Sequence, residues 1–122
     1  MMPKLNLLGE PLLPCSHQPL TGYFRDGYCR TDAQDRGRHV VCAQVTEAFL
    51  TYSKAQGNDL ITPQLGFPGL KPGDFWCLCA LRWLEAFEAG VAPPIVFAAT
   101  DQALLSYVEL KVLQSFALDK TI

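Results

Sequence analysis

Prolines and glycines limit most strongly what this chain can fold into, because they leave few stretches long enough for a helix or a strand. They interrupt residues 1–38 repeatedly, among other places at Pro11, Pro14, Pro19, Gly22, Gly27 and Gly37. They interrupt the segment 58–74 again, at Pro63, Gly66, Pro68, Gly69, Pro72 and Gly73. Proline fixes φ and lacks an amide donor, and glycine favours turns. We therefore expect a loop-rich N-terminal half and a long loop over 58–74, a kind of segment that is often functional.

Regular structure in the first half is expected between these breaks. The Asp26-Gly27 pair suits a two-residue turn and predicts a β-hairpin near 23–30. The sequence HVVCAQV is rich in β-branched residues and predicts a buried strand near 39–45. Thr46 is a natural N-cap, and the apolar residues that follow it recur at helical spacing. A helix near 46–56 follows from that pattern.

The second half predicts an α/β pattern. An amphipathic helix is expected near 80–89, where Gly90 ends it, followed by an apolar strand near 95–100. A helix near 101–117 comes next, in one piece or two, because Leu110 falls off its apolar face. The whole predicts an α+β fold in a single compact domain over 1–122, with residues 1–5 as a flexible N-terminal end.

Composition excludes several functional classes. Hydrophobic residues make up 49% of the 122 residues and the net charge is −2, so the chain is long enough and apolar enough to bury a core. The scattered charges offer no clustered basic face for nucleic acid and no polybasic segment for a membrane surface. No apolar run is long enough to span a bilayer, and the N-terminus does not resemble a signal peptide, so we expect a cytoplasmic protein.

Five cysteines are many for a chain of this length, and their number is odd. In a reducing cytoplasm we expect free thiols, metal ligands or a redox pair rather than a structural disulfide framework. The sequence Cys77-Leu78-Cys79 is the most informative part of this set. In a strand both side chains lie on one face, whereas in a helix they point about 200° apart. We favour an extended FWCLC with the helix starting near Ala80, which places Cys79 at a helix N-terminus.

Two hypotheses compete for the cysteines. The first is a zinc or thiol-redox site, with candidates Cys15, Cys29, His39, Cys42, Cys77 and Cys79. Zinc is the candidate metal. The second is that the cysteines fill the core, because free cysteine is among the most buried residue types. The usual C-x-x-C spacings are absent, and His39 at a strand start is most often hydrogen-bonded to backbone, so we favour core packing.

Polar residues in loops form a third set of candidates, for binding a small polar ligand: Arg25, Asp26, Asn58, Asp59, Asp74 and Arg82. Each also has an ordinary structural interpretation, as a turn, cap or surface ion-pair residue. They would form a binding site if several converged on one cleft. No nucleotide-binding, P-loop, HExxH or GxSxG motif accompanies them.

Several segments together resemble a known family: NLLGEPLLPC, TGYFRDGYC, HVVCAQVTEAFLTYSKAQGNDLITP, FPGLKPGDFWCLCALRW and AGVAPPIVFAAT. The chain is similar over 6–118 to the bacterial family catalogued as domain of unknown function 2237. The resemblance implies a stand-alone cytoplasmic protein in which the cysteines are signature positions. It implies no activity and no ligand.

The function is therefore unknown from the sequence, and whether the chain is an enzyme is open. We favour a small binding or accessory domain with a polar cleft near 67–82, for a small polar ligand or a protein partner. The alternative is a cysteine-based zinc-binding or thiol-redox protein that uses Cys77 and Cys79 with Cys15, Cys29 or Cys42. A second alternative is a structural protein that forms a homodimer through its C-terminal helices, with Leu105, Val108, Val112 and Phe116 exposed.

Overall fold

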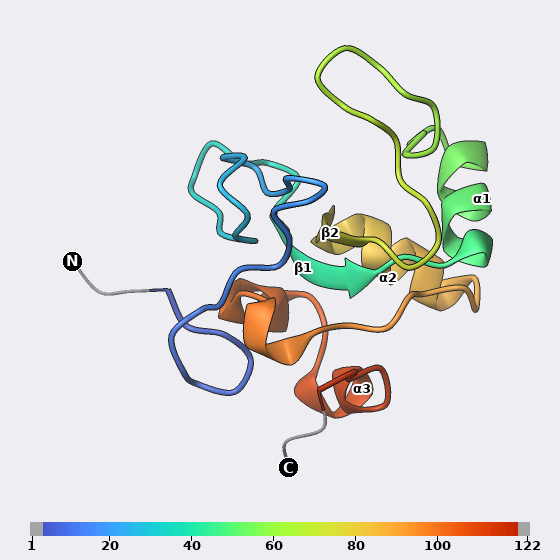
Figure 1. Ribbon diagram of the computed structural model, residues 1–122. Coiled ribbons are helices and arrows are strands. Elements are labelled where there is room, and N and C mark those ends of the chain that lie inside the picture. The colour runs from blue at the N-terminus through green and yellow to red at the C-terminus, as the bar shows by residue number, and fades with distance from the viewer. Residues whose placement is uncertain (1–3, 120–122) are drawn as a thin grey trace.

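The centre of the molecule is a sheet of two antiparallel strands, β1 (His39–Gln44) and β2 (Phe75–Cys79), in a computed structural model that describes residues 4–119 (Figure 1). Their middle residues are buried because the strands are made almost entirely of apolar side chains. Cys42 lies opposite Cys77 in the register, and His39 lies opposite Cys79. The pairing shifts between His39 and Val41, so that one extra residue, Val40, is accommodated there.

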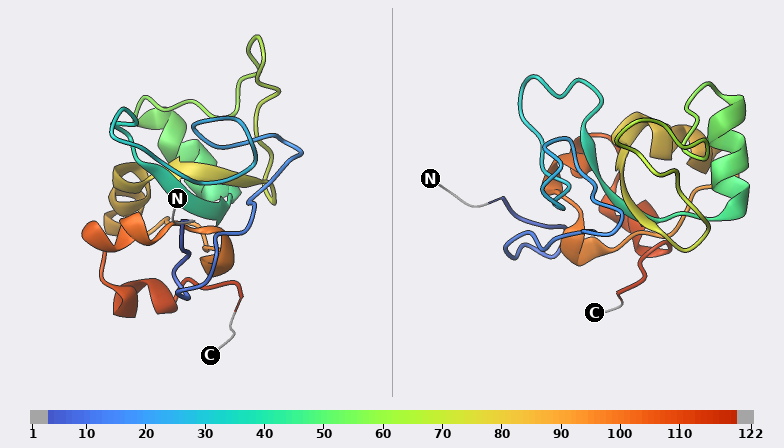
Figure 2. Two further views of the ribbon diagram at one scale, coloured as in Figure 1. Left: turned by 90° about the vertical axis from the view of Figure 1, so that its left-hand side faces the viewer. Right: turned by 45° about the horizontal axis from the view of Figure 1, so that its top comes forward.

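Two helices flank the sheet, as the sequence predicts. Helix α1 (Glu47–Ala55) begins after Thr46, whose hydroxyl accepts a hydrogen bond from the amide of Phe49. Helix α2 (Ala80–Glu88) follows β2 directly and contacts α1 (Figure 2). It buries Trp83 completely, and the indole donates to the carbonyl of Pro93. The extended FWCLC segment and the helix start at Ala80 are therefore both confirmed.

The C-terminal third differs from the prediction in its details. In place of a strand near 95–100 there is a short 3₁₀ helix, η1 (Phe97–Ala99). The reason is that the carboxylate of Asp119 accepts from the amides of Phe97 and Ala98, which are then not available to a ladder. The helix near 101–117 forms as two short pieces, a 3₁₀ helix η2 (Gln102–Ser106) and α3 (Leu110–Gln114).

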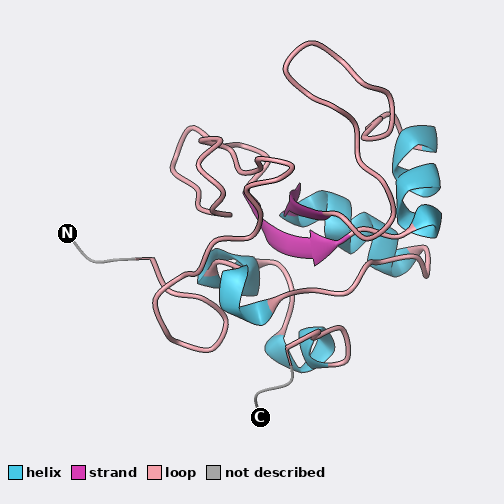
Figure 3. Cartoon of the chain, in the orientation of Figure 1, coloured by secondary structure: helices cyan, strands magenta, loops and turns pink. Residues whose placement is uncertain are grey.

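The hairpin predicted near 23–30 is wrong. The chain there makes consecutive turns, in which the amide of Arg25 donates to Gly22 and the amide of Gly27 donates to Thr21. Arg25 has a φ of 55° and Gly27 a φ of 89°, and the carboxylate of Asp26 accepts from the amide of Tyr28. These local bonds use the backbone groups that a hairpin would pair. The N-terminal segment up to the start of β1 therefore runs as loops and turns over one side of the sheet (Figure 3).

The long loop over 58–74 is present as predicted and projects from the body of the molecule (Figure 1). Its base is closed by a hydrogen bond from the amide of Leu70 to the carbonyl of Leu60, and its tip by paired bonds between Gln64 and Phe67. Leu70 is buried in the main core, whereas Leu65 at the tip is fully exposed. The loop is thus anchored at its base and open at its tip.

The α+β fold class is confirmed, and the elements share one core of strands, helices and short turns. Residues 1–3 of the end expected to be flexible lie outside the described part, and the carbonyls of Lys4 and Leu5 accept hydrogen bonds from Leu12 and Gln102. Among residues 4–119, no helix combines the length and the apolar character that crossing a bilayer requires.

Candidate functional site

Four of the five cysteines form two disulfides. Cys15 bonds to Cys42, and Cys29 bonds to Cys77. The expectation that no disulfide framework forms is therefore wrong. Cys42 and Cys77 are cross-strand partners in the sheet, and the N-terminal loops bring Cys15 and Cys29 over them. The four sulfurs form a second, smaller core with Ala99, apart from the main aliphatic and aromatic core.

Cys79 keeps a free thiol. It is the last residue of β2 and the N-cap of α2, and its side chain is half-buried. The first amides of a helix have no partner within the helix and carry partial positive charge. Cys79 makes no capping hydrogen bond to them, so its sulfur is directed elsewhere.

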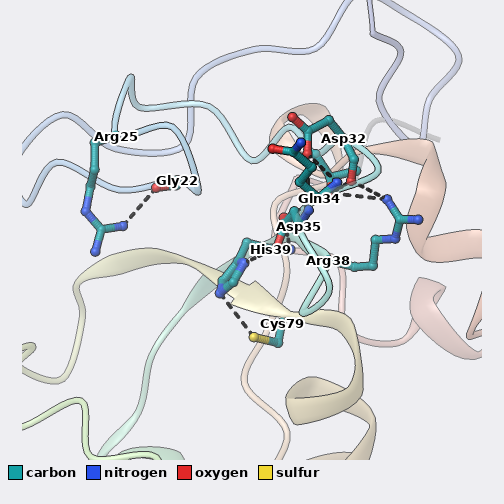
Figure 4. Close-up of polar contacts among 9 residues, drawn as sticks. Gly22, Arg25, Asp32, Gln34, Asp35, Arg38, His39 and Cys79 are labelled. Carbon is teal, nitrogen blue, oxygen red and sulfur yellow. Dashed lines mark hydrogen bonds and ion pairs between the residues drawn. The ribbon is translucent and has the colours of Figure 1, made fainter.

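The Cys79 sulfur lies 3.2 Å from Nε2 of His39. The other ring nitrogen, Nδ1, lies 2.7 Å from Oδ1 of Asp35. The three side chains are in line, with the imidazole between the sulfur and the carboxylate (Figure 4). The arrangement of a nucleophile, a base and a group that orients the base is the one that activates thiols in covalent catalysis. The sequence interpretation of His39 as a boundary residue hydrogen-bonded to backbone is therefore wrong, because both of its ring nitrogens contact side chains.

Asp35 is held rigidly. Its side chain is 1% exposed and also accepts hydrogen bonds from the hydroxyl of Thr31 and from the backbone amide of His39. Burial by itself would raise the pKa of Asp35, but the bonds from the amide and imidazole of His39 and from Thr31 outweigh it and lower that pKa. The carboxylate is thus ionised at neutral pH and fixes the orientation of the imidazole.

The charge state of His39 follows from its two partners. The hydrogen bond with Cys79 raises the pKa of His39 to about 9, against the effect of burial, and the charges of Cys79 and Asp35 act in the same direction. A protonated imidazole donates to both neighbours at once, to the carboxylate and to the sulfur. His39 therefore lies where it can exchange a proton with the sulfur of Cys79.

Two neighbours enclose this pair. A Cβ atom on Gly37 would lie 2.9 Å from the sulfur of Cys79 and 3.0 Å from Cε1 of His39, so only glycine fits there without displacing one of them. The ring of Tyr23 stacks on the imidazole with a centroid distance of 6.0 Å. Gly37 and Tyr23 therefore lie against the pair, and the sulfur of Cys79 has an open approach of its own.

That approach is a groove of about 390 Å³ lined by Gly37, Cys79, Leu81, Arg82 and Glu85. Arg82 was predicted as a ligand-binding residue, and its guanidinium pairs with Glu85 at 3.3 Å while staying partly exposed. The start of α2 borders the same region, because Cys79 is its N-cap, and the first helical amide, that of Ala80, donates to the carbonyl of Arg38. The groove therefore combines a thiol with the ion pair of Arg82 and Glu85.

A second cleft lies against His39 and includes Phe67 and Trp76, from the segment near 67–82 where a polar cleft is expected. Its volume is about 390 Å³, and its lining includes Arg25, His39, Asp59, Phe67 and Trp76. The guanidinium of Arg25 lies 5.1 Å from the centre of the Trp76 ring. Hydrogen bonds from Thr62 and Ile61 lower the pKa of Asp59 to about 2. Two of the six polar candidates, Arg25 and Asp59, thus share a cleft with His39.

The other three polar candidates have local roles. Asp26 pairs with Arg30 at 2.7 Å, and the carboxylate of Asp74 accepts from the amide of Lys71 in a turn. The carbonyl of Asn58 accepts from Ser53 at the end of α1. These residues stabilise turns and do not join the groove or the cleft.

Sequence reasoning missed three members of the site, Thr31, Asp35 and Gly37. An aspartate four residues before the one histidine that opens a strand was the available signal, but spacing in a loop does not reveal which side chains meet. The pairing of His39 with Cys79 was equally hidden, because it depends on the shift in strand register at Val40.

Comparison with known proteins bears on identity but not on activity. Residues 5–117 match the family described as "Uncharacterized protein conserved in bacteria (DUF2237)". The chain belongs to this family. A search of curated proteins found no match to the chain. The resemblance inferred from the cysteine-bearing segments is therefore confirmed, and function has to be argued from the site itself.

Proposed function

We propose that this DUF2237 protein performs covalent thiol chemistry, with Cys79 as nucleophile, His39 as its proton partner and Asp35 as the positioning residue. The observation that carries the proposal is the line of contacts from the sulfur through the imidazole to a buried carboxylate, at 3.2 and 2.7 Å. The reaction class that uses such a line is acyl transfer. The substrate class is a small molecule with an activated carbonyl group.

The first step would form a thioester. The sulfur of Cys79 attacks the carbonyl carbon, and the negative charge develops on the carbonyl oxygen beside the start of α2, where the helix carries partial positive charge. The bond to the leaving group then breaks, and His39 delivers its Nε2 proton to that group. Asp35 keeps the imidazole in place by accepting from Nδ1.

The second step would release the acyl group. A water molecule attacks the thioester, His39 accepts one of its protons, and the sulfur leaves with the electron pair of the carbon–sulfur bond. A carboxylic acid departs and the starting state is restored. The groove beside Cys79 supplies the open approach for substrate and water.

The other predictions are compatible with this proposal and independent of it. The polar cleft containing Arg25 and Asp59 supports binding of a small polar molecule next to His39. A single domain over the whole chain, a cytoplasmic location, a lack of nucleic-acid binding and a homodimer all stay predictions. For the homodimer, Val108 is buried and Phe116 packs against Trp83, so these two side chains face the core rather than a partner.

The test uses the native chain with its disulfides intact and p-nitrophenyl acetate as the acyl donor. We expect a burst of about one equivalent of p-nitrophenolate per chain and an acetyl group on Cys79 in peptide mass spectrometry. His39→Asn keeps a donor for Asp35 but lacks Nε2, and should slow the burst at least about tenfold.

His17→Asn is the matched control, because His17 is the other histidine, lies against Gly27 and makes no hydrogen bond to the triad in the described part of the chain. It should leave the burst unchanged. Equal bursts in the chain with and without Nε2 of His39, or acetylation confined to lysines, would overturn the proposal.

A further inference from the structure

The paired cysteines hold a second feature, which the triad does not use. The sulfurs of Cys15, Cys29 and Cys42 all lie within 4.8 Å of one another. The sulfur of Cys77 is bonded to that of Cys29, and its backbone lies opposite Cys42 in the sheet. The two disulfides are therefore neighbours, and four sulfurs come together between the sheet and the N-terminal loops.

We propose that these four cysteines bind one Zn²⁺ ion when the chain is reduced. Zinc prefers tetrahedral thiolate sites with Zn–S bonds of about 2.3 Å, which places ligand sulfurs about 3.8 Å apart. The sulfurs of Cys15, Cys29 and Cys42 lie within 4.8 Å of one another, and those of Cys15 and Cys42 are bonded. When both disulfides open, the bonded sulfurs separate towards the zinc-ligand spacing, and Cys77 becomes the fourth ligand.

The surroundings suit a structural rather than a catalytic ion. Cys29 and Cys42 are completely buried and Cys77 is 2% exposed. An ion bound by these three sulfurs would therefore be shielded from bulk solvent on that side. Cys15 is partly exposed and gives the ion a route of entry. Cys42 and Cys77 are fixed by the strand pairing, and their amides bond to the hydroxyls of Thr100 and Thr21.

The exchange between the two states balances. Each disulfide takes up two electrons and two protons from a thiol reductant, which is itself oxidised to a disulfide. Zn²⁺ then displaces the four thiol protons and forms four Zn–S bonds. Disulfides and zinc would hold the N-terminal loops to the sheet at the same point, one in an oxidising and the other in a reducing environment.

The set of ligands differs from the one expected from sequence. Cys79 is hydrogen-bonded to His39, and Cys77 forms a disulfide with Cys29. The two cysteines that the sequence places together therefore belong to different sites. His39 likewise belongs to the triad rather than to the metal site. This division provides the controls for a test.

The experiment is a titration of the full-length chain with Co²⁺ and then Zn²⁺, under anaerobic conditions after reduction with a phosphine. We expect the near-ultraviolet charge-transfer band and the visible bands of a tetrahedral thiolate–cobalt site, which Zn²⁺ abolishes at one equivalent. Native mass spectrometry of the zinc form should show one ion per chain, lost on acidification.

Cys79→Ser is the matched variant and should bind Zn²⁺ as the natural chain does, whereas Cys42→Ser should bind at least about tenfold more weakly. The oxidised chain should bind none. Absence of the charge-transfer band in the reduced natural chain, whether or not that chain is folded, would overturn the proposal, as would equal affinity of the chain and Cys42→Ser. The result does not depend on the acyl-transfer proposal, because that one is tested at Cys79 in the oxidised chain.

Discussion

Cys77 and Cys79 lie two residues apart on one strand, but the fold places them in opposite environments. Cys77 is buried, bonded to Cys29 and surrounded by other sulfurs. Cys79 is half-buried, unbonded and next to a histidine that is oriented by a buried carboxylate. One sulfur is thus bonded inside a core, and the other is a free thiol in contact with an imidazole.

The surroundings of the two sulfurs differ because Cys77 lies inside β2, whereas Cys79 lies at its end. Cys77 lies within the ladder, where the cross-strand neighbour is Cys42 and the N-terminal loops cover the sulfur. Cys79 is the point at which β2 becomes α2, and its cross-strand neighbour is His39. Four measurements test this difference between the two cysteines.

The largest effect is expected from removing the structural sulfurs. Cys29→Ala combined with Cys77→Ala opens a loop closed across a sequence separation of 48, for which the chain-entropy relation gives about 4 kcal/mol. The free energy of unfolding in urea, without reductant, should fall by about this amount. Cys79→Ser should change it by less than about 1 kcal/mol. A larger loss at Cys79 than at the pair would reverse the contrast.

Gly37→Ala is expected to disturb the reactive sulfur next. The new Cβ would lie 2.9 Å from the sulfur and 3.0 Å from Cε1 of the imidazole, so at least one of these side chains must move. Overpacking of this kind costs about 2 kcal/mol, which urea unfolding would show. Alkylation of Cys79 by iodoacetamide should slow in the same variant. If the rate stays that of the natural chain, contact with His39 does not control reactivity.

His39→Asn tests that contact directly. At pH 7.5 in the oxidised chain, Cys79 should react with iodoacetamide about tenfold more slowly, because its sulfur loses the ring nitrogen that can accept its proton. The rate is read by mass spectrometry of the labelled peptide. His17→Asn should react at the rate of the natural chain, and a matching loss in that control would point to a general change in the fold.

The smallest effect is a dependence of stability on pH. The folded pKa of His39 is about 9, above the value of about 6.5 for an unfolded histidine. Protonation of His39 therefore stabilises the folded state. This contribution to the free energy of unfolding is fully present below about pH 6.5 and is lost as the pH rises through 9. Because the side chain is 34% exposed, solvent screening reduces it to the order of 1 kcal/mol.

Urea unfolding of the natural chain and of His39→Asn, at pH 6 and at pH 10, gives this difference. The gap between the two chains should shrink at the higher pH. If the difference in free energy of unfolding between the two chains grows with pH instead, the raised pKa does not belong to His39.

Local sequence patterns predicted the parts of the fold that depend on neighbouring residues. Thr46 and the apolar spacing after it specified α1, and the run from Phe75 to Cys79 specified an extended segment that ends where α2 begins. The hairpin near 23–30 failed because side chains such as Asp26 satisfied the backbone locally. The strand near 95–100 failed because a distant carboxylate, Asp119, took its amides.

The sequence alone was enough to predict the fold class, the long loop over 58–74 and the family, and it singled out the five cysteines as candidate site or core residues. Tertiary packing alone decided which cysteines form disulfides and which one contacts His39. The contact with His39 depends on the extra residue at Val40, which shifts the register so that His39 rather than Val40 faces Cys79. A disulfide, or a hydrogen bond between His39 and Cys79, forms only when the two partner atoms lie a few ångströms apart. The partners are 27 to 48 positions apart in the sequence, so only packing brings them together.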